Sequence, residues 1–253
     1  MPVNQPLDGR AMLVTGASSG IGRAIAIAAA RAGADVAITY RENRDGARLT
    51  EREIEGLGRH AVSLRLDLAD DRSVADVGPA ACEALGRLDV WVNNAGADIL
   101  TGAGAALPPV ERLDQLLAVD LRGTILASWH AVDILDARGG VIINMSWDHV
   151  LTGMAGRNPQ MYAAVKGGVL AFSKALARSV APRVRVNVLA PGWIETAFGA
   201  DLDEADHRAI AESTPLKRWG TPDDVAGAAV FLASPAASFL TGQTILVGGG
   251  AVM

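Results

Sequence analysis

A glycine-rich turn decides the fold of this chain: Thr15-Gly16-Ala17-Ser18-Ser19-Gly20-Ile21-Gly22. It follows an apolar run at 11–14 and precedes an alanine-rich stretch at 21–32, which predicts a helix that ends at Gly33. Glycines let the backbone approach a pyrophosphate closely, and the first turn of a helix offers that anion N–H groups and a favourable dipole. A strand, this turn and a helix in succession therefore predict a dinucleotide-binding unit.

The rest of the chain repeats the alternation of strand and helix. Helical patterns occur at 44–58, 71–85, 110–136, 162–180 and 222–233, and the pattern loosens between Pro191 and about Thr214. Apolar runs predict strands between them, at 35–40, 61–66, 88–92, 141–145, 184–189 and 244–247. Such alternation is typical of right-handed parallel crossovers. We expect an α/β fold, a single Rossmann-type doubly wound parallel sheet with helices on both faces, in one domain over 1–253.

Composition narrows the functional classes. Half of the 253 residues are hydrophobic and the formal net charge is −5, which argues against a nucleic-acid partner because such binders need clustered cations. No long uncharged apolar stretch predicts a membrane span, and residues 1–9 do not resemble a signal peptide, so we expect a cytoplasmic protein. The four histidines and the single cysteine are scattered, and no metal site is expected.

Four motifs occur in the order that is typical of one enzyme family. They are the turn at 15–22, Asn93-Asn94-Ala95-Gly96, Tyr162-Ala163-Ala164-Val165-Lys166, and Arg185-Val186-Asn187 leading to Pro191-Gly192. With these motifs the whole chain resembles the short-chain dehydrogenase/reductase family, in particular its 3-oxoacyl-carrier-protein reductase-like members. The resemblance implies an NAD(P)-dependent oxidoreductase that transfers hydride between nicotinamide and a carbonyl or alcohol substrate.

Most of the residues expected to bind the cofactor lie at or just after the ends of predicted strands or at the start of the first predicted helix, while Tyr162 and Lys166 lie on the predicted helix at 162–180. By resemblance, Asp67 and Leu68 flank the adenine, Asn94 steadies a strand end, and Ile194 and Thr196 close on the carboxamide. The full set is Gly16, Ser18, Ser19, Gly20, Ile21, Gly22, Tyr40, Arg41, Asp67, Leu68, Asn94, Ala95, Gly96, Tyr162, Lys166, Pro191, Gly192, Ile194 and Thr196.

The end of the second strand bears on the choice of cofactor. An acidic residue there accepts from a ribose 2′-hydroxyl and repels a 2′-phosphate, but this chain has Tyr40-Arg41. A guanidinium suits phosphate, so NADP(H) is expected in preference to NAD(H). The next residue, Glu42, is acidic and therefore favours NAD(H).

Tyr162 and Lys166 are the expected catalytic pair. They stand four residues apart on a predicted helix and therefore share one face. A nearby ammonium stabilises a phenolate, so Tyr162 can act as general acid in reduction and general base in oxidation. By resemblance, Lys166 also binds the nicotinamide ribose.

Two expected catalytic positions depart from the family pattern. Asp120 stands where relatives carry asparagine; its backbone carbonyl could still hold a relay water, while its carboxylate would raise the phenol pKa by neutralising Lys166. The usual serine that binds the substrate carbonyl corresponds either to Ser146, at the strand end, or by spacing to His149.

The remaining expectations concern substrate and assembly. Trp147, His149, Met154, Trp193 and Phe198, with Met161, are expected to line an apolar cleft for a small-molecule substrate, a hydrophobic ketone or acyl-type carbonyl rather than a free sugar. Two other functions stay open: an NADP(H)-binding sensor or scaffold with weakened catalysis, and an NAD(H)-linked alcohol dehydrogenase. The resemblance also implies a homotetramer or homodimer.

Overall fold

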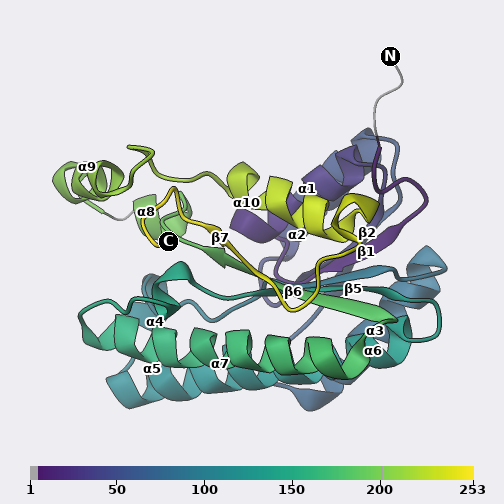
Figure 1. Cartoon of the computed structure of the whole chain (residues 1–253), viewed down its shortest axis with the longest axis horizontal. Coiled ribbons are helices and arrows are strands. Elements are labelled where there is room, and N and C mark those ends of the chain that lie inside the picture. The colour runs from purple at the N-terminus through teal and green to yellow at the C-terminus, as the bar shows by residue number, and fades with distance from the viewer. Residues whose placement is uncertain (1–4, 201) are drawn as a thin grey trace.

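The computed structural model describes residues 5–200 and 202–253, except for the side chains of 198 and 200. In this part of the chain seven parallel strands form one sheet in the order β3-β2-β1-β4-β5-β6-β7 (Figure 1). The expected doubly wound α/β sheet is thus confirmed. The strands are β1 (Ala11–Val14), β2 (Asp35–Tyr40), β3 (Ala61–Arg65), β4 (Val90–Asn93), β5 (Gly140–Met145), β6 (Val184–Pro191) and β7 (Thr244–Val247).

Helices cover both faces of the sheet. One face carries α1 (Gly20–Arg31), α2 (Arg44–Gly56) and α10 (Pro222–Ala233), and the other carries α3 (Asp71–Leu85), α6 (Thr124–Leu135) and α7 (Arg157–Val180) (Figure 1). Shorter elements surround the carboxyl ends of the strands or extend these helices. They are α4 (Gly102–Ala106), α5 (Pro109–Leu116), η1 (Leu117–Gly123), η2 (Asp148–Val150), α8 (Ala197–Ala200), α9 (Glu204–Ser213) and η3 (Pro235–Ala237).

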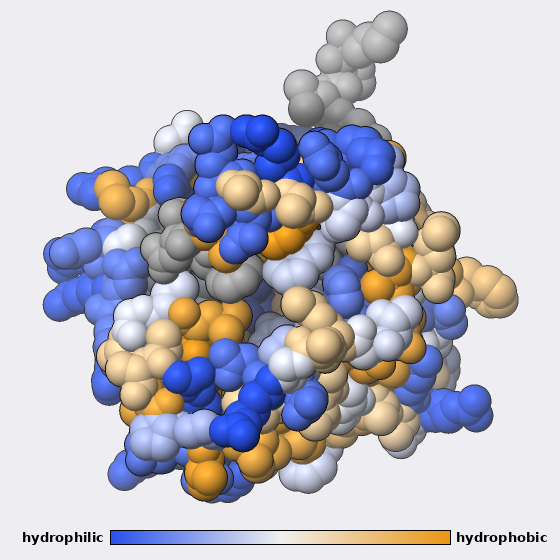
Figure 2. Space-filling model, turned by 90° about the vertical axis from the view of Figure 1, so that its left-hand side faces the viewer, coloured by the Kyte–Doolittle hydropathy of each residue, from blue (hydrophilic) through white to orange (hydrophobic). Residues whose placement is uncertain are grey.

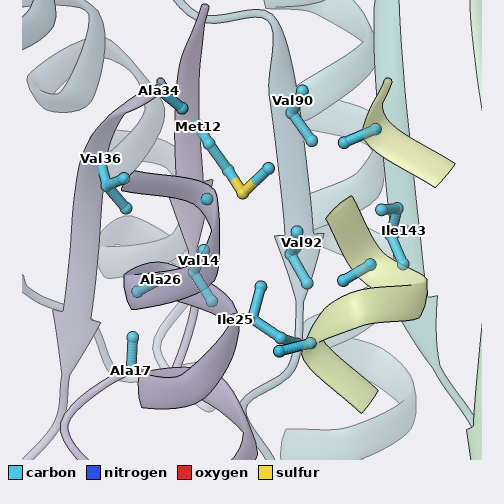
Figure 3. Packing of buried hydrophobic residues seen from close by; sticks show 14 of the residues in the cluster. Met12, Val14, Ala17, Ile25, Ala26, Ala34, Val36, Val90, Val92 and Ile143 are labelled. Atoms are coloured by element: carbon cyan, nitrogen blue, oxygen red, sulfur yellow. The ribbon is translucent and has the colours of Figure 1, made fainter. Parts of the chain in front are cut away.

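The strands are apolar throughout because both of their faces are buried. In β1, Met12 and Val14 pack against α1 and α10, whereas Leu13 between them packs on the opposite face. Figure 3 shows the first of these two cores, where Ile25 of α1 lies beside Val14 and Val92. Each such side chain, once removed from water, stabilises the fold by about 1.5–3 kcal/mol. Continuous apolar strands therefore indicate a parallel sheet covered on both sides.

Three features differ from the sequence-based expectations by more than a residue or two at an element's end. The helix at 157–180 begins five residues before the expected start, because Pro159 lies in its first turn, where proline costs no hydrogen bond. The expected single helix at 110–136 is divided by the π-helical segment η1. The region expected to be irregular after Pro191 contains α8 and α9.

The strand order places the site. The chain leaves β1 toward β2 on one side and returns to β4 on the other side, so that a crevice opens at the carboxyl ends of β1 and β4. Figure 2 faces the side of the molecule on which α8 and α9 lie, where hydrophobic and hydrophilic side chains surround a hollowed middle. No helix among the described residues is long and apolar enough to cross a bilayer.

Candidate active site

The backbone of the glycine-rich turn adopts a conformation that requires glycine and leaves the first N–H groups of α1 accessible. Gly16 and Gly20 adopt positive φ angles of 65° and 53°, a region that glycine enters without steric cost. A Cβ at Gly22 would overlap the carbonyl oxygen of Gly16. The hydroxyl of Ser19, the residue before α1, makes no capping hydrogen bond to that helix. The first N–H groups of α1 are therefore available to an anion such as a pyrophosphate.

Asn94 ties this turn to the end of β4. Its side-chain amide donates to the backbone carbonyl oxygens of Thr15, at 3.0 Å, and Gly16, at 3.3 Å. The Thr15 hydroxyl in turn accepts from the backbone N–H groups of Asn94 and Ala95, each at 2.9 Å. Asn94 thus steadies the strand end, as expected, while the part played by Thr15 was not anticipated.

One cleft of about 1010 Å³ joins all these strand ends. Every residue expected to bind the cofactor lines it, from the turn at 16–22 through Arg41, Asp67 and Asn94 to Thr196. The glycine turn, its open helix N-terminus and the adjoining strand ends thus fit an extended dinucleotide. A nicotinamide bound there would be held by the 191–196 segment and by Lys166, and would supply or accept hydride.

Arg41 lies at the rim of this cleft, at the end of β2. Its side chain is half exposed, and one guanidinium nitrogen lies 3.1 Å from a carboxylate oxygen of Glu42. An exposed ion pair of this kind contributes little energy and is easily exchanged for another anion. The guanidinium can therefore turn to a ligand without a large energetic cost.

Tyr162 and Lys166 both come from α7 and both line the cleft. The Lys166 ammonium is buried and lies 5.4 Å from the centroid of the Tyr162 ring. It also donates to the carbonyl oxygen of Met145 at 3.4 Å. The predicted pair therefore shares one helix face, one turn apart, with its cation next to the phenol.

Asp120 completes a buried charge cluster. It lies in η1 and is 1% exposed; one carboxylate oxygen lies 2.9 Å from the Lys166 ammonium, and the other accepts from the backbone N–H of Ala97 at 2.7 Å. The carboxylate of Asp120 thus lies directly against the Lys166 ammonium. A serine or alanine in place of Gly96 would crowd this carboxylate, since a Cβ there would lie 2.7 Å from it.

The pKa values of two groups at this site, Tyr162 and Lys166, are raised. Burial raises the pKa of the Tyr162 phenol; Lys166 opposes that shift, and Asp120 adds to it. Burial disfavours the charged form of Lys166, but the Asp120 carboxylate and the Tyr162 phenol together outweigh burial, so that the pKa of Lys166 is raised. Around neutral pH the site therefore contains a charged ammonium and a protonated phenol.

Of the residues after β5, neither Ser146 nor His149, the two expected to bind the substrate carbonyl, presents a free donor to the cleft. The Ser146 hydroxyl is 4% exposed and donates to the backbone carbonyl of Lys166 at 2.9 Å, so its hydrogen is directed at the protein. Instead, the ring of Trp147 meets the Tyr162 ring edge-on, with 5.4 Å between centroids. His149 stacks on Trp147 at 5.0 Å and does not line the cleft.

The substrate end of the cleft is largely apolar. Trp147, Met154 and Trp193 line it as expected, while Met161 lies on α7 and packs against Ile99 and Val165 instead. The side chain of Phe198 falls outside the described part of the structure. Lining residues that were not anticipated come from the loop after β4 and the start of α7. They are Asp98, Ile99, Leu100, Thr101, Asn158 and Pro159.

Loop shape explains why these residues were missed. Asp98 accepts from the backbone N–H groups of Leu100 and Thr101, at 3.0 and 2.9 Å, which folds the loop back over the cleft. An aspartate that accepts from backbone N–H groups two and three residues later predicts a turn. The sequence does not predict whether that turn packs over the cleft, because this depends on the sheet beneath it. Among the described residues no group of three or more histidine, cysteine, aspartate or glutamate side chains could hold a metal ion.

A glycine turn and a tyrosine–lysine pair that share one cleft across a doubly wound sheet define a nicotinamide-dependent oxidoreductase. Comparison with known proteins agrees with this class. Residues 16–252 match the family model described as enoyl-(acyl carrier protein) reductase. The chain belongs to the short-chain dehydrogenase/reductase family, whose members bind nicotinamide cofactors and act on CH–OH or carbonyl groups.

Three relatives illustrate the range of the family around this chain. L-rhamnose 1-dehydrogenase (NAD(P)(+)) of Sphingomonas sp. is 38% identical over 249 residues, 96% of each protein. A 3-oxoacyl-[acyl-carrier-protein] reductase of Aquifex aeolicus is 36% identical, over 96% of this chain and 98% of the relative. A short chain dehydrogenase from Burkholderia cenocepacia, solved in complex with NADP, has a TM-score of 0.87 and 35% identity, over 97% of this chain and 99% of that chain.

Proposed function

We propose that this protein reduces an apolar ketone or 3-oxoacyl-type carbonyl with NADPH. The observation that carries the proposal is that Tyr162 and Lys166 line the same cleft as the glycine turn. When bound, the nicotinamide supplies the hydride. Tyr162 donates its phenolic proton to the substrate oxygen, and Lys166 holds the cofactor ribose and stabilises the phenolate that remains.

The preference for NADP(H) rests on Arg41. Its guanidinium stands at the end of β2, on the rim of the cleft, where a 2′-phosphate would replace the exposed Glu42 carboxylate as its partner. The relative solved with NADP supports this choice, while the name of the L-rhamnose relative allows both cofactors.

The choice of an apolar substrate rests on the cleft wall. Trp147, Trp193, Met154 and Ile99 place aromatic and aliphatic surface near Tyr162, which suits a hydrophobic group beside the reacting carbonyl. The relatives' names do not decide the substrate, because they include both a sugar dehydrogenase and an acyl-carrier-protein reductase.

Weakened catalysis is the second candidate, and two observations favour it. The Ser146 hydroxyl is bonded to the protein rather than directed at the cleft, and the catalytic lysine is paired with Asp120. A protein of this kind would bind NADPH as a sensor or scaffold without efficient turnover. Turnover measurements separate the two functions.

The test follows NADPH oxidation with cyclohexanone, acetophenone and the N-acetylcysteamine thioester of acetoacetate, and NADP⁺ reduction with L-rhamnose. We expect turnover of at least one of the three carbonyl compounds, and a loss of about 10²–10⁴-fold in kcat for Tyr162→Phe with NADPH binding retained. Turnover of L-rhamnose alone would overturn the proposed substrate class. NADPH binding without any turnover would favour the sensor.

We also propose a homotetramer or homodimer. Trp129 of α6 is 53% exposed and makes an edge-to-face contact with Phe172 of α7, with 6.4 Å between ring centroids. An exposed tryptophan that packs on a partly buried phenylalanine of the adjacent helix supports a protein contact at this face.

A further inference from the structure

Two of the residues that could polarise the substrate oxygen are already engaged by the protein. The Ser146 hydroxyl donates to the Lys166 carbonyl oxygen at 2.9 Å. The Nδ1 atom of His149 lies 2.6 Å from a carboxylate oxygen of Asp148, and its ring does not line the cleft. The side chain that stands beside Tyr162 in the cleft is Trp147.

Among the described residues the indole N–H of Trp147 donates to no protein acceptor, and it is not one of the fully buried polar atoms that lack a partner. Two other tryptophans show the usual arrangement: Trp91 donates to the Asn93 side chain at 2.8 Å, and Trp219 donates to the His207 carbonyl oxygen at 2.9 Å. Trp147 lines the cleft, so its donor is accessible there and the oxygen of a bound ligand can accept from it in place of water.

A buried aspartate fixes the position of this indole. Asp148 is fully buried and accepts from both the backbone N–H, at 2.7 Å, and the ring Nδ1 of His149. The His149 ring stacks on Trp147 with 5.0 Å between centroids and 23° between planes. The carboxylate fits between the ends of β6 and β7 because Gly192 and Gly248 stand there; a Cβ at either position would overlap it. Trp147 is thus held from behind by a rigid unit.

We propose that Trp147 orients the substrate by donating its indole N–H to the oxygen of the reacting carbonyl, next to the Tyr162 hydroxyl. Asp148 and His149 are positioning residues that act through the indole. The inference rests on the proposed carbonyl reduction, and it assigns to an aromatic donor the task that the sequence assigned to Ser146 or His149. A donor of this kind strengthens its bond as negative charge develops on the oxygen.

The decisive variant is Trp147→Phe, which removes the N–H and keeps an aromatic ring. With cyclohexanone and NADPH we expect kcat to fall by about 10²-fold with a smaller change in KM, because the bond is strongest in the transition state. Trp219→Phe is the matched control, since it removes an indole N–H outside the cleft lining, and it should retain kcat within about threefold. Thermal unfolding and NADPH binding, measured for each variant, confirm that the fold is intact.

The positioning role is tested by a double mutant. His149→Phe keeps a stacking ring but breaks the bond to Asp148, and we expect a smaller loss of kcat than for Trp147→Phe. If His149 acts through the indole, the double variant should lose no more activity than Trp147→Phe alone. Multiplicative losses would show that His149 acts independently and would overturn this part of the proposal.

The outcomes separate this inference from the proposed function. If the wild-type protein reduces none of the carbonyl compounds, the proposed function fails. If the wild type is active and Trp147→Phe is equally active, the indole donor is wrong while the function stands. A larger loss for Ser146→Ala than for Trp147→Phe would return the donor role to the hydroxyl.

Discussion

Replacing Asp120 by asparagine removes one charge from the buried cluster and leaves its shape nearly unchanged. In the wild type the carboxylate lies 2.9 Å from the Lys166 ammonium and also accepts from the backbone N–H of Ala97. The amide oxygen of asparagine can keep one of these bonds. The variant therefore tests what the charge does, apart from the packing.

The size of the effect follows from the distances. Two unit charges 2.9 Å apart attract by about 6 kcal/mol at an effective dielectric constant of about 20. The cost of burying both charges offsets much of this attraction, and breaking a buried pair by removing one partner costs about 3–5 kcal/mol. Because asparagine retains a hydrogen bond, we expect a loss of about 3 kcal/mol, which lowers the unfolding midpoint by about 6–12 °C.

The same substitution should change the pH dependence of catalysis. The raised pKa of Tyr162 keeps the phenol protonated to higher pH, so reduction falls and oxidation rises as the pH passes through that value. With the charge placed at the ring centroid, 5.4 Å away, Lys166 stabilises the phenolate by about 3 kcal/mol at the same dielectric constant of about 20. Once Asp120 is neutral, that stabilisation is restored in part, and both limbs of the profiles should move to lower pH.

Profiles of kcat against pH in both directions, together with thermal unfolding, measure these two effects. Asp89→Asn is the control: Asp89 is 2% exposed and bonded to the Ala11 N–H and to Arg87, at the amino ends of β1 and β4, far along the sheet from the phenol. It should lose stability without a change in profile. If Asp120→Asn loses stability but its limbs coincide with those of the wild type, the electrostatic argument is refuted and Asp120 is structural.

Two further expectations concern cofactor and assembly. Arg41→Ala should raise the Kd for NADPH by about 10–100-fold, because a charge-assisted contact to the 2′-phosphate is lost, and should change the Kd for NADH by less than about threefold. Equal losses of affinity for both cofactors in titration calorimetry would contradict the phosphate role. Light scattering should give a dimer or tetramer for the wild type and a smaller species for Trp129→Glu. That substitution places a charge at the exposed Trp129 position, beside Phe172. A monomeric wild type would show that the proposed interface does not exist.

The sequence was sufficient to predict the sheet and the cofactor side of the cleft, because both depend on local signals. Apolar runs with turn residues between them predict strands, and the turn at 16–22 can bind phosphate only at the start of a helix. The four-residue spacing of Tyr162 and Lys166 fixes their common helix face. These relationships extend over a few residues, and the fold preserves them.

The substrate side could not be predicted as far, because it depends on contacts between distant segments. The Ser146 hydroxyl donates to a carbonyl twenty residues later, and the Ala97 N–H meets a carboxylate twenty-three residues away. Either Ser146 or Trp147, the two residues after β5, could face Tyr162. The backbone conformation at the end of the strand decides between them, and the sequence spacing does not predict that conformation. The structure shows that Trp147 occupies that place.

Asp120 and Trp147 affect the same step in the same direction. Burial and the aspartate together keep the phenol protonated. An indole N–H can only donate, whereas a serine hydroxyl can donate or accept. A carbonyl oxygen only accepts, so it can accept from the indole N–H and from the Tyr162 hydroxyl at once. An alcohol must donate its O–H to the Tyr162 oxygen, which does not need the phenol as a donor. Since an enzyme cannot change the equilibrium of its reaction, this preference must appear in binding. We therefore expect a lower KM for the carbonyl than for the corresponding alcohol near neutral pH, and Trp147→Phe should reduce that difference.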